Sequence, residues 1–190
     1  MRLLLLARHG QSLFNVDGVV NGDPSRDLGL SPLGMDEGRK LAKQIAAVAI
    51  DLCVVSEFRR AQQTAQLALE GREIPTHVDS ELNDVRVGSL EGQSLADYRT
   101  WKHAHTRADR FPDGESLDDA AHRYARAYAR LLDRTEETIL CVCHEIPVRY
   151  AVNGAAGSEN LDAPLHDVAN ATPYVFDQAG LRRAVERLKL

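Results

Sequence analysis

An arginine and a histidine stand side by side at positions 8 and 9, between the apolar run Leu3–Ala7 and Gly10. A short apolar run that ends in a glycine turn is typical of a buried strand. Open α/β sheets bind ligands at the carboxyl edge, where such a strand ends. An imidazole placed there can attack phosphorus, and a guanidinium can clamp phosphoryl oxygens with two hydrogen bonds. The tripeptide alone is weakly specific, so the rest of the chain must supply the other parts of such a site.

Polar and ionisable side chains follow three further apolar runs. The polar stretch 56–65 comes after the run that ends at Val55, and Leu82-Asn83-Asp84 and the stretch 88–92 come after the expected strand 76–78. His144 follows directly on the apolar run 138–143. The carboxyl ends of parallel strands meet at one edge of a sheet. We therefore expect two histidines, at least two arginines and a carboxylate to gather there.

The elements that would position these groups alternate between strand-like and helix-like patterns, which predicts an α/β fold with a parallel sheet. Ser31 and Pro32 have the residue types of an N-cap and a first helical residue. A helix is expected at 59–69, and apolar spacing from Leu117 to Leu132 predicts a strongly amphipathic one. The expected strands are 3–7, 51–55, 76–78, 138–143 and 173–177, and a further helix is expected at 147–156.

Two segments are harder to assign. The polar stretch 94–116 is expected to form a small excursion over the sheet edge and the active site. At the C-terminus we predict an antiparallel edge hairpin, formed by 173–177 and 181–185 around a turn at 178–180. A helix over the arginine-rich stretch 180–189 is the alternative. No repeat or linker is visible, so the 190 residues are expected to form one domain.

Composition limits the classes of function. The chain has 44% hydrophobic residues, and no apolar run approaches the ~20 residues that span a bilayer. The leucine run near the N-terminus is too short for the core of a signal peptide. We therefore expect a cytoplasmic protein that binds no membrane. A net charge of −5 without dense Lys/Arg clusters argues against nucleic acid as a partner. Cys53, Cys141 and Cys143 lie in apolar runs at spacings that suit neither zinc nor a redox pair.

Six stretches in this order resemble the histidine phosphatase superfamily, also called phosphoglycerate mutase-like. They are Arg8-His9-Gly10 with Asn15, the helix opening at 30–34, the stretch 56–65, the stretch 88–92, Pro112–Ser116 and Val142-Cys143-His144. The resemblance covers residues 3 to about 150. It implies a three-layer α/β/α sandwich with a mostly parallel central sheet, and a reaction through phosphohistidine.

The same resemblance implies a role for each site residue. His9 is expected to attack phosphorus, and Arg8, Arg60 and His144 to hold the phosphoryl oxygens with help from Asn15. Asp84 occupies the position of the acid that protonates the leaving oxygen. An imidazole must be neutral to attack, and the adjacent Arg8 would depress the pKa of His9 by charge repulsion. Explanations without a catalytic role stay open for the same residues. Asn15 could be a turn former, Asp84 an ordinary loop carboxylate, and the arginines could form surface ion pairs.

Two residues depart from the family pattern. The acid is usually glutamate where this chain has Asp84, which is one methylene shorter and puts its reach in question. Glu145 stands where glycine is usual, and its carboxylate would repel a substrate if it pointed inward, or bind a hydroxyl or amine of the substrate. Glu57 and Glu91 are alternative acids.

Three other readings involve neighbouring residues. Cys143 and Arg149 have the spacing of cysteine-dependent phosphatases, but the intervening loop has no glycine and loses one donor at Pro147. His103 and His105 could hold a metal with His122 or Asp109, although histidines on a polar segment are more often solvated. Finally, Tyr98, Trp101, Lys102 and Arg107 could shape substrate choice, and plain packing explains them equally well.

The leading hypothesis is a metal-independent phosphomonoester hydrolase that needs no cofactor and acts on a small phosphorylated metabolite. A phosphoglycerate-type phosphomutase is the nearest alternative. A relative that binds a phosphate ligand or a protein without turnover is the alternative from another class, motivated by Asp84 and Glu145. A homodimer could form through the C-terminal edge.

Overall fold

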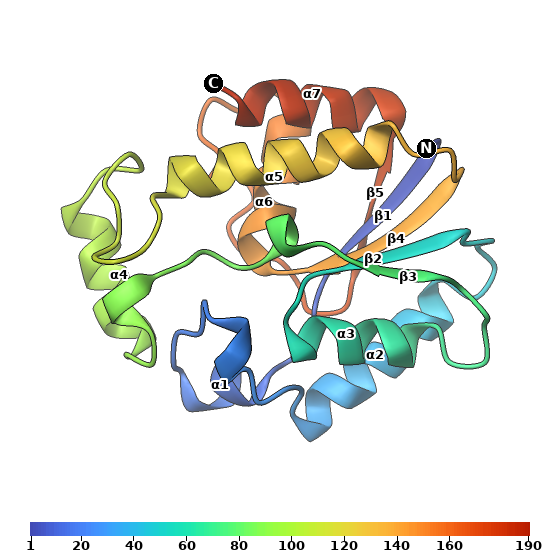
Figure 1. The fold of residues 1–190 in the computed structure, drawn as a ribbon, viewed down its shortest axis with the longest axis horizontal. Helices are drawn as coiled ribbons and strands as arrows, with labels where there is room; N and C mark the ends of the chain where they lie inside the picture. Colours follow the sequence, from blue (N-terminus) through green and yellow to red (C-terminus); the bar gives the residue numbers. More distant parts are fainter.

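The computed structural model describes residues 1–190 and is built on a five-stranded sheet in the order β3-β2-β4-β1-β5 (Figure 1). Four of the strands run parallel, and β5 pairs antiparallel with β1. The strands are β1 (Leu3–Arg8), β2 (Leu52–Val55), β3 (Thr76–Val78), β4 (Thr138–Cys143) and β5 (Pro173–Asp177). The mixed, mostly parallel sheet is therefore as expected, including an antiparallel edge strand.

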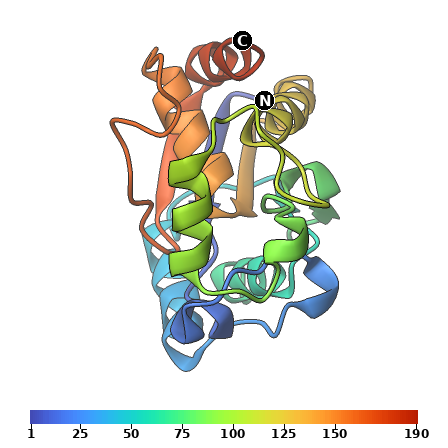
Figure 2. The ribbon, with the colours of Figure 1, turned by 90° about the vertical axis from the view of Figure 1, so that its left-hand side faces the viewer.

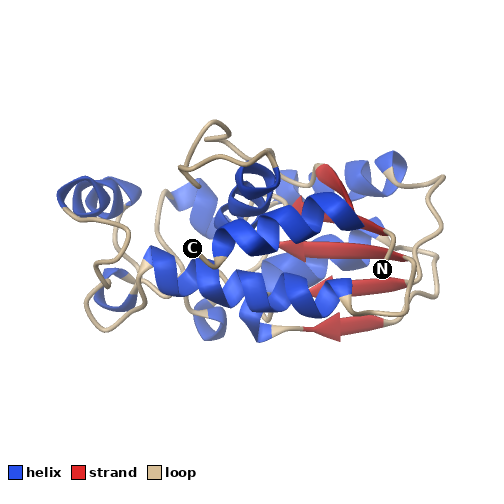
Figure 3. Ribbon diagram, turned by 90° about the horizontal axis from the view of Figure 1, so that it is seen from above, coloured by secondary structure: helices blue, strands red, loops and turns tan.

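Helices cover both faces of the sheet, which gives three layers (Figures 1 and 3). One face packs against α2 (Pro32–Gln44) and α3 (Arg59–Ala68) around a core of 15 buried residues. The other face packs against α5 (Leu117–Leu132), α6 (Glu145–Ala155) and α7 (Gln178–Leu188) around a core of 31 buried residues. Successive residues of β1 point to opposite faces, so Leu4 and Leu6 enter the larger core and Leu5 and Ala7 the smaller one.

Because both faces are covered, the central strands are apolar throughout. All six residues of β4 are buried, as are Leu4 to Ala7 of β1. Each fully buried leucine stabilises the fold by about 1.5–3 kcal/mol relative to an exposed one. This burial holds β1 and β4 together at the centre of the molecule.

The register between β1 and β4 fixes the positions of the two residues that come directly after these strands. Arg8 lies opposite Cys143, and the backbone N–H of His9 donates to the carbonyl of Cys143 at 2.9 Å. The next residues, His9 and His144, therefore leave the sheet side by side at its carboxyl edge. Sequence alone predicted the two strands, and their pairing puts the two imidazoles in one place.

The C-terminal hairpin prediction was wrong in its second half. Residues 178–188 form helix α7, which begins with Asp177 as its N-cap, and the alternative of a helix in this stretch is confirmed. Leu181, Ala184, Val185 and Leu188 are buried at helical spacing, so the 3.6-residue period outweighs the short strand-like run. The antiparallel edge at β5 remains, without a partner strand from this segment.

Two loops contain short helices. The loop 10–30 holds α1 (Leu13–Asp17) and a 3₁₀ turn at Pro24–Arg26. Elsewhere in the chain, α6 begins at Glu145, two residues before the predicted start. Further 3₁₀ turns lie at Ser80–Leu82 and Gly88–Leu90. The excursion contains α4 (Leu95–Ala104), which stands beyond the carboxyl ends of the strands (Figures 1 and 3). None of the helices is both long and apolar enough to cross a membrane.

Candidate active site

His9 lies at the end of β1, and only 3% of its surface is exposed. Its Nδ1 lies 2.6 Å from the carbonyl oxygen of Gly10, an acceptor, so Nδ1 carries the proton and donates. The lone pair is then on Nε2, which faces Arg60. Burial lowers the pKa of His9 well below the usual value, and the positive charges of Arg60 and Arg8 lower it further. The ring is therefore neutral and nucleophilic at neutral pH.

His144 follows β4 and is fully buried beside His9. The two ring centroids lie 5.2 Å apart with the rings inclined at 66°. Nε2 of His144 lies 2.9 Å from the Ser56 hydroxyl, which can donate or accept, and Nδ1 turns toward Arg60. Burial again lowers the pKa of this ring, with Arg60 as the next cause. The Ser56 contact fixes the ring so that Nδ1 is presented to the same space as Nε2 of His9.

Arg60, in the first turn of α3, connects these groups. Its Nε donates to Nε2 of His9 at 3.0 Å, and one terminal nitrogen lies 3.3 Å from Nδ1 of His144. The same terminal nitrogen lies 3.4 Å from Oδ2 of Asp84. Only 4% of the Arg60 side chain is exposed. We call His9, Arg60, Asp84 and His144 the cradle, because they enclose one space at the carboxyl edge.

Asp84 completes the cradle from the loop after β3. Its Oδ2 lies 3.6 Å from Nδ1 of His144, and its Oδ1 accepts a hydrogen bond from the backbone of Val85. Burial raises the pKa of Asp84 above the usual value, Arg60 opposes this shift, and the negative charge of Glu145 adds to it. A carboxyl group with a raised pKa holds its proton to higher pH, which suits a proton donor.

Arg8 sits at the edge of this space rather than inside it. One terminal nitrogen donates to the carbonyl of Val168 at 2.9 Å and lies 3.0 Å from Oε2 of Glu145. Glu145 also pairs with Arg149, one turn along α6, at 3.3 Å. The carboxylate that departs from the family pattern is thus held between two arginines.

Asn15 and the two alternative acids have other contacts. Asn15 forms a capping box with Ser12 at the start of α1, so its side-chain oxygen accepts from the Ser12 backbone. Glu57 accepts from the side chain of Asn83, and Glu91 accepts from Asn21 and from the backbone of Gly22. Asp84 is the carboxylate that the structure brings to His144 and Arg60, and substrate binding by Asn15 stays a prediction.

Three polar residues of the site were missed by the sequence reasoning. Asn21 accepts from Arg60 through its side chain at 2.6 Å and through its backbone at 3.1 Å. Asp27 accepts from the backbone N–H of Arg60 at 2.8 Å and pairs with its guanidinium at 3.3 Å. The third is Ser56. Asn21 and Asp27 lie in a loop rich in turn-forming residues, where only their burial distinguishes them from ordinary turn formers.

The alternative readings of this region find no support in the geometry. Cys143 is buried in the larger core, and helix α6 begins at Glu145, so no loop of backbone donors surrounds the sulfur. His105 stacks on Trp101 with ring centroids 4.0 Å apart. No group of three or more His, Cys, Asp or Glu side chains is placed to hold a metal ion.

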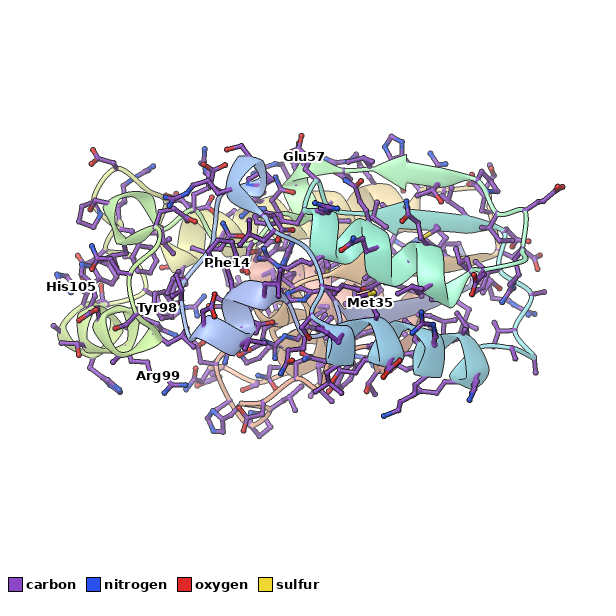
Figure 4. The ribbon with its side chains drawn as sticks, turned by 90° about the horizontal axis from the view of Figure 1, so that it is seen from below. Phe14, Met35, Glu57, Tyr98, Arg99 and His105 are labelled. Carbon is purple, nitrogen blue, oxygen red and sulfur yellow. The ribbon has the colours of Figure 1, made fainter.

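A chain of ion pairs borders the cradle on the side of α4. We call Arg8, Glu145, Arg149, Asp162, Arg107 and Lys102 the rim network. Asp162 joins its two halves, because it pairs with Arg149 at 3.4 Å, with Arg107 at 2.7 Å and with Lys102 at 3.7 Å. Figure 2 shows α4 in front of the carboxyl ends of the strands. Tyr98 and His105 lie on α4 at the end of the molecule away from Met35 (Figure 4).

A cavity lies behind the loop that carries Asp84. Its volume is about 530 Å³, and no member of the cradle lines it. Asn83, Arg86 and Arg123 are among its lining residues. The Asp84 loop therefore separates the cradle from this cavity.

Comparisons with known proteins agree with this geometry. A family model described as histidine phosphatase superfamily (branch 1) matches residues 4–190. The chain is 32% identical to a 2,3-bisphosphoglycerate-dependent phosphoglycerate mutase from Methylobacterium sp. (strain 4-46), over 92% of this chain and 90% of that protein. It is also 32% identical to the 6-phosphofructo-2-kinase/fructose-2,6-bisphosphatase 4 of Rattus norvegicus, of which it spans 38%. The structure of the α-ribazole phosphatase from Shigella flexneri superposes with a TM-score of 0.80 at 28% identity, over 92% of this chain and 90% of that one.

Proposed function

This chain belongs to the histidine phosphatase superfamily, branch 1, and from that premise we propose that it is a phosphomonoester hydrolase acting through phospho-His9. The observation that carries the proposal is the neutral, buried imidazole of His9, whose Nε2 faces the guanidinium of Arg60 at 3.0 Å. His144 and Asp84 border the same space. The proposed substrate is a small phosphorylated metabolite.

In the first step, a phosphoryl oxygen takes over the Nε–H of Arg60 that Nε2 of His9 otherwise accepts. The freed lone pair on Nε2 then forms a bond to phosphorus while the bond from phosphorus to the leaving oxygen breaks. Asp84 gives its proton to that oxygen, so the product leaves as an alcohol. Arg60 stabilises the charge on the phosphoryl oxygens, and so does His144 in the tautomer that carries its proton on Nδ1 while the Ser56 hydroxyl donates to Nε2. Both side chains cost little reorganisation because they are already buried and fixed. Arg8 supplies a further cation once a phosphoryl oxygen replaces Glu145 as its partner.

In the second step, water attacks phosphorus and the bond to Nε2 of His9 breaks. The Asp84 carboxylate accepts a proton from that water, and phosphate leaves. Asp84 thus acts as acid and then as base, which restores the starting protonation states. Every charge in this scheme comes from side chains of the chain itself, which motivates the proposal that no metal ion is required.

The test is a phosphatase screen over a panel of sugar phosphates, nucleotides, phosphoglycerates and phosphopeptides, run with and without EDTA. We expect release of phosphate from at least one class, no effect of EDTA, and acid-labile phosphate on the enzyme when the reaction is stopped rapidly. Tight phosphate binding without turnover, and without labelled enzyme, would instead support a non-catalytic relative.

A mutase activity is the second candidate, favoured by the 32% identity to a phosphoglycerate mutase along 92% of this chain. Mutase and hydrolase share the phosphohistidine and differ in what accepts the phosphoryl group. An assay with 3-phosphoglycerate and a bisphosphate primer separates them. Isomerisation faster than phosphate release identifies a mutase, and the reverse identifies a hydrolase.

A further inference from the structure

The loop that carries Asp84 is held from behind by helix α5. Arg123 donates from one terminal nitrogen to the carbonyl oxygens of Glu81 and Asn83, at 2.8 and 2.9 Å, and from the other to the carbonyl of Asp84 at 3.2 Å. The Tyr124 hydroxyl donates to the same Asn83 carbonyl at 3.1 Å. One guanidinium therefore binds three backbone carbonyls within four residues.

Glu115 holds this guanidinium in place. Its Oε1 accepts from a terminal nitrogen of Arg123 at 2.5 Å, and its Oε2 accepts from Nε at 3.3 Å. Oε1 also accepts from the backbone N–H of Arg86 at 3.0 Å. Glu115 is 1% exposed, so it has little access to water as an alternative partner. Arg123 therefore binds the backbone of the loop at residues 81–84, and Glu115 binds it at residue 86. The two side chains together hold the backbone before and after the Asp84 side chain.

The carboxyl group of Asp84 has one short hydrogen bond of its own, from the backbone N–H of Val85 to Oδ1 at 3.0 Å, and that donor belongs to the same loop. Its contacts to Arg60 and His144 are long, at 3.4 and 3.6 Å, and 26% of the side chain is exposed. The side chain of aspartate is one methylene shorter than that of glutamate. If the loop backbone is displaced, the carboxyl group of Asp84 therefore has less freedom to return to its position. A misplacement of about 1 Å at a reacting group can cost on the order of 100-fold in rate.

We propose that Arg123, seated by Glu115, is a positioning residue that sets where Asp84 presents its proton to the leaving oxygen. This inference rests on the proposed phosphatase function. Arg123 makes no hydrogen bond to a side chain of the cradle, so its hydrogen bonds reach Asp84 only through the backbone of the loop. Its positive charge also lowers the pKa of His144, and a lysine at this position keeps that charge.

The kinetic test compares Arg123→Lys with the wild type on two substrates. An alkyl phosphate has a poor leaving group that needs the acid, whereas 4-nitrophenyl phosphate has a good one that does not. We expect kcat/KM to fall roughly 10- to 100-fold for the alkyl phosphate and less than about 3-fold for 4-nitrophenyl phosphate, because only part of the ~10²–10⁴-fold contribution of a general acid is lost. In an Asp84→Asn background, Arg123→Lys should cost the alkyl phosphate nothing more.

Arg126→Lys is the matched control. Arg126 lies one turn further along α5 and pairs with the side chain of Glu81, without binding the loop carbonyls. This variant should leave the ratio between the two substrates unchanged. Equal losses on both substrates in Arg123→Lys, or losses that add to those of Asp84→Asn, would overturn the positioning role.

Two further measurements test the inference if Arg123→Lys folds poorly or if the enzyme turns over neither substrate. Tyr124→Phe removes one bond to the Asn83 carbonyl, and we expect a fewfold loss confined to the alkyl phosphate. A crystal structure of Arg123→Lys should show Asp84 displaced from Arg60 and His144, and an unmoved Asp84 would refute the inference whatever the activity. Absence of wild-type turnover would count against the proposed function alone.

Discussion

The cradle and the rim network are both dense in charge, yet they are built differently. Three of the four members of the cradle, His9, Arg60 and His144, are each at most 3% exposed and come from strand ends or the first turn of a helix. Asp84 is the exception, with 26% of its side chain exposed. The members of the rim network come largely from α6, the excursion and the loop before β5, and their side chains are 12–33% exposed. Burial fixes the first set, while solvent reaches the second.

This difference separates reaction from recognition. The Arg60 guanidinium is anchored by Asn21 and Asp27, so it can stay in place while its N–H groups turn from His9 to a phosphoryl oxygen. Ion pairs at partly exposed sites are worth only about 0–1 kcal/mol, so those of the rim network can exchange partners with a charged ligand. We therefore expect substitutions in the cradle to lower kcat. Substitutions in the rim network should change KM, except at Arg8, which also contacts the phosphoryl group in the proposed mechanism.

The largest effect is expected in the cradle itself. In the proposed mechanism, His9→Ala removes the group that accepts the phosphoryl moiety, and loss of a nucleophile costs on the order of 10⁴-fold or more in kcat. Steady-state turnover and the amount of acid-labile phosphate on the enzyme should fall together. His105→Ala is the control, because His105 is exposed on α4 and should leave both quantities unchanged.

Asp84→Asn should be next in size and should depend on the leaving group. The asparagine keeps the shape and cannot give up a proton, so alkyl phosphates should lose about 10²–10⁴-fold in kcat. A nitrophenyl ester should lose far less, since its leaving oxygen needs no proton. Rates measured across a series of leaving groups give the slope that tests this, and an equal loss for all esters would remove Asp84 from the role of acid.

The pH dependence should follow from two opposite pKa shifts. Burial raises the pKa of Asp84, so its proton is present below that raised value and lost as pH increases through it. The lowered pKa of His9 keeps the ring neutral well below the usual histidine range. For an alkyl phosphate, kcat should fall by up to about tenfold per pH unit on the alkaline side. A nitrophenyl ester, or the Asp84→Asn variant, should lack that decline.

The smallest effect is expected at the rim network. Lys102→Ala removes one partner of Asp162, at 3.7 Å, and leaves Arg107 and Arg149 in place. We expect KM for substrates with an anionic leaving group to rise about 2- to 5-fold, with kcat unchanged and the free energy of unfolding altered by less than about 1 kcal/mol. Arg99→Ala, on the same helix, serves as the comparison. A large fall in kcat for Lys102→Ala would show that this part of the rim network takes part in the chemical step, and would contradict the prediction.

The regular elements were predictable because local pattern and tertiary burial agree. Apolar runs marked β1, β2 and β4, and Ser31 with Pro32 marked the start of α2, which the structure confirms. The prediction for the segment after β5 failed because the five residues 181–185, taken alone after a turn-like stretch, are too few to show a helical period. The spacing of Leu181, Ala184 and Leu188 indicates a helix only over about two turns.

The cradle was predictable to the extent that it follows strand ends. His9 and His144 come directly after buried runs, and Arg60 comes shortly after another. The roles of Asn21 and Asp27 could not be predicted from the sequence. Both lie in a loop of turn-forming residues, which has no hydrophobic periodicity to indicate which side chains point inward. The direction of Glu145 was equally hidden, since it depends on Arg8 and Arg149 together.

The pairing of residue 8 with residue 143 also limits how this chain can change. A single amino acid gained or lost within either central strand would exchange inward and outward faces and pull the two imidazoles out of line. The excursion around α4 carries no such constraint, because it contributes no rung to the sheet. A change in the length of that segment would therefore leave the spacing of the two histidines unchanged, provided that Phe111 stays buried and Lys102 and Arg107 keep their ion pairs with Asp162.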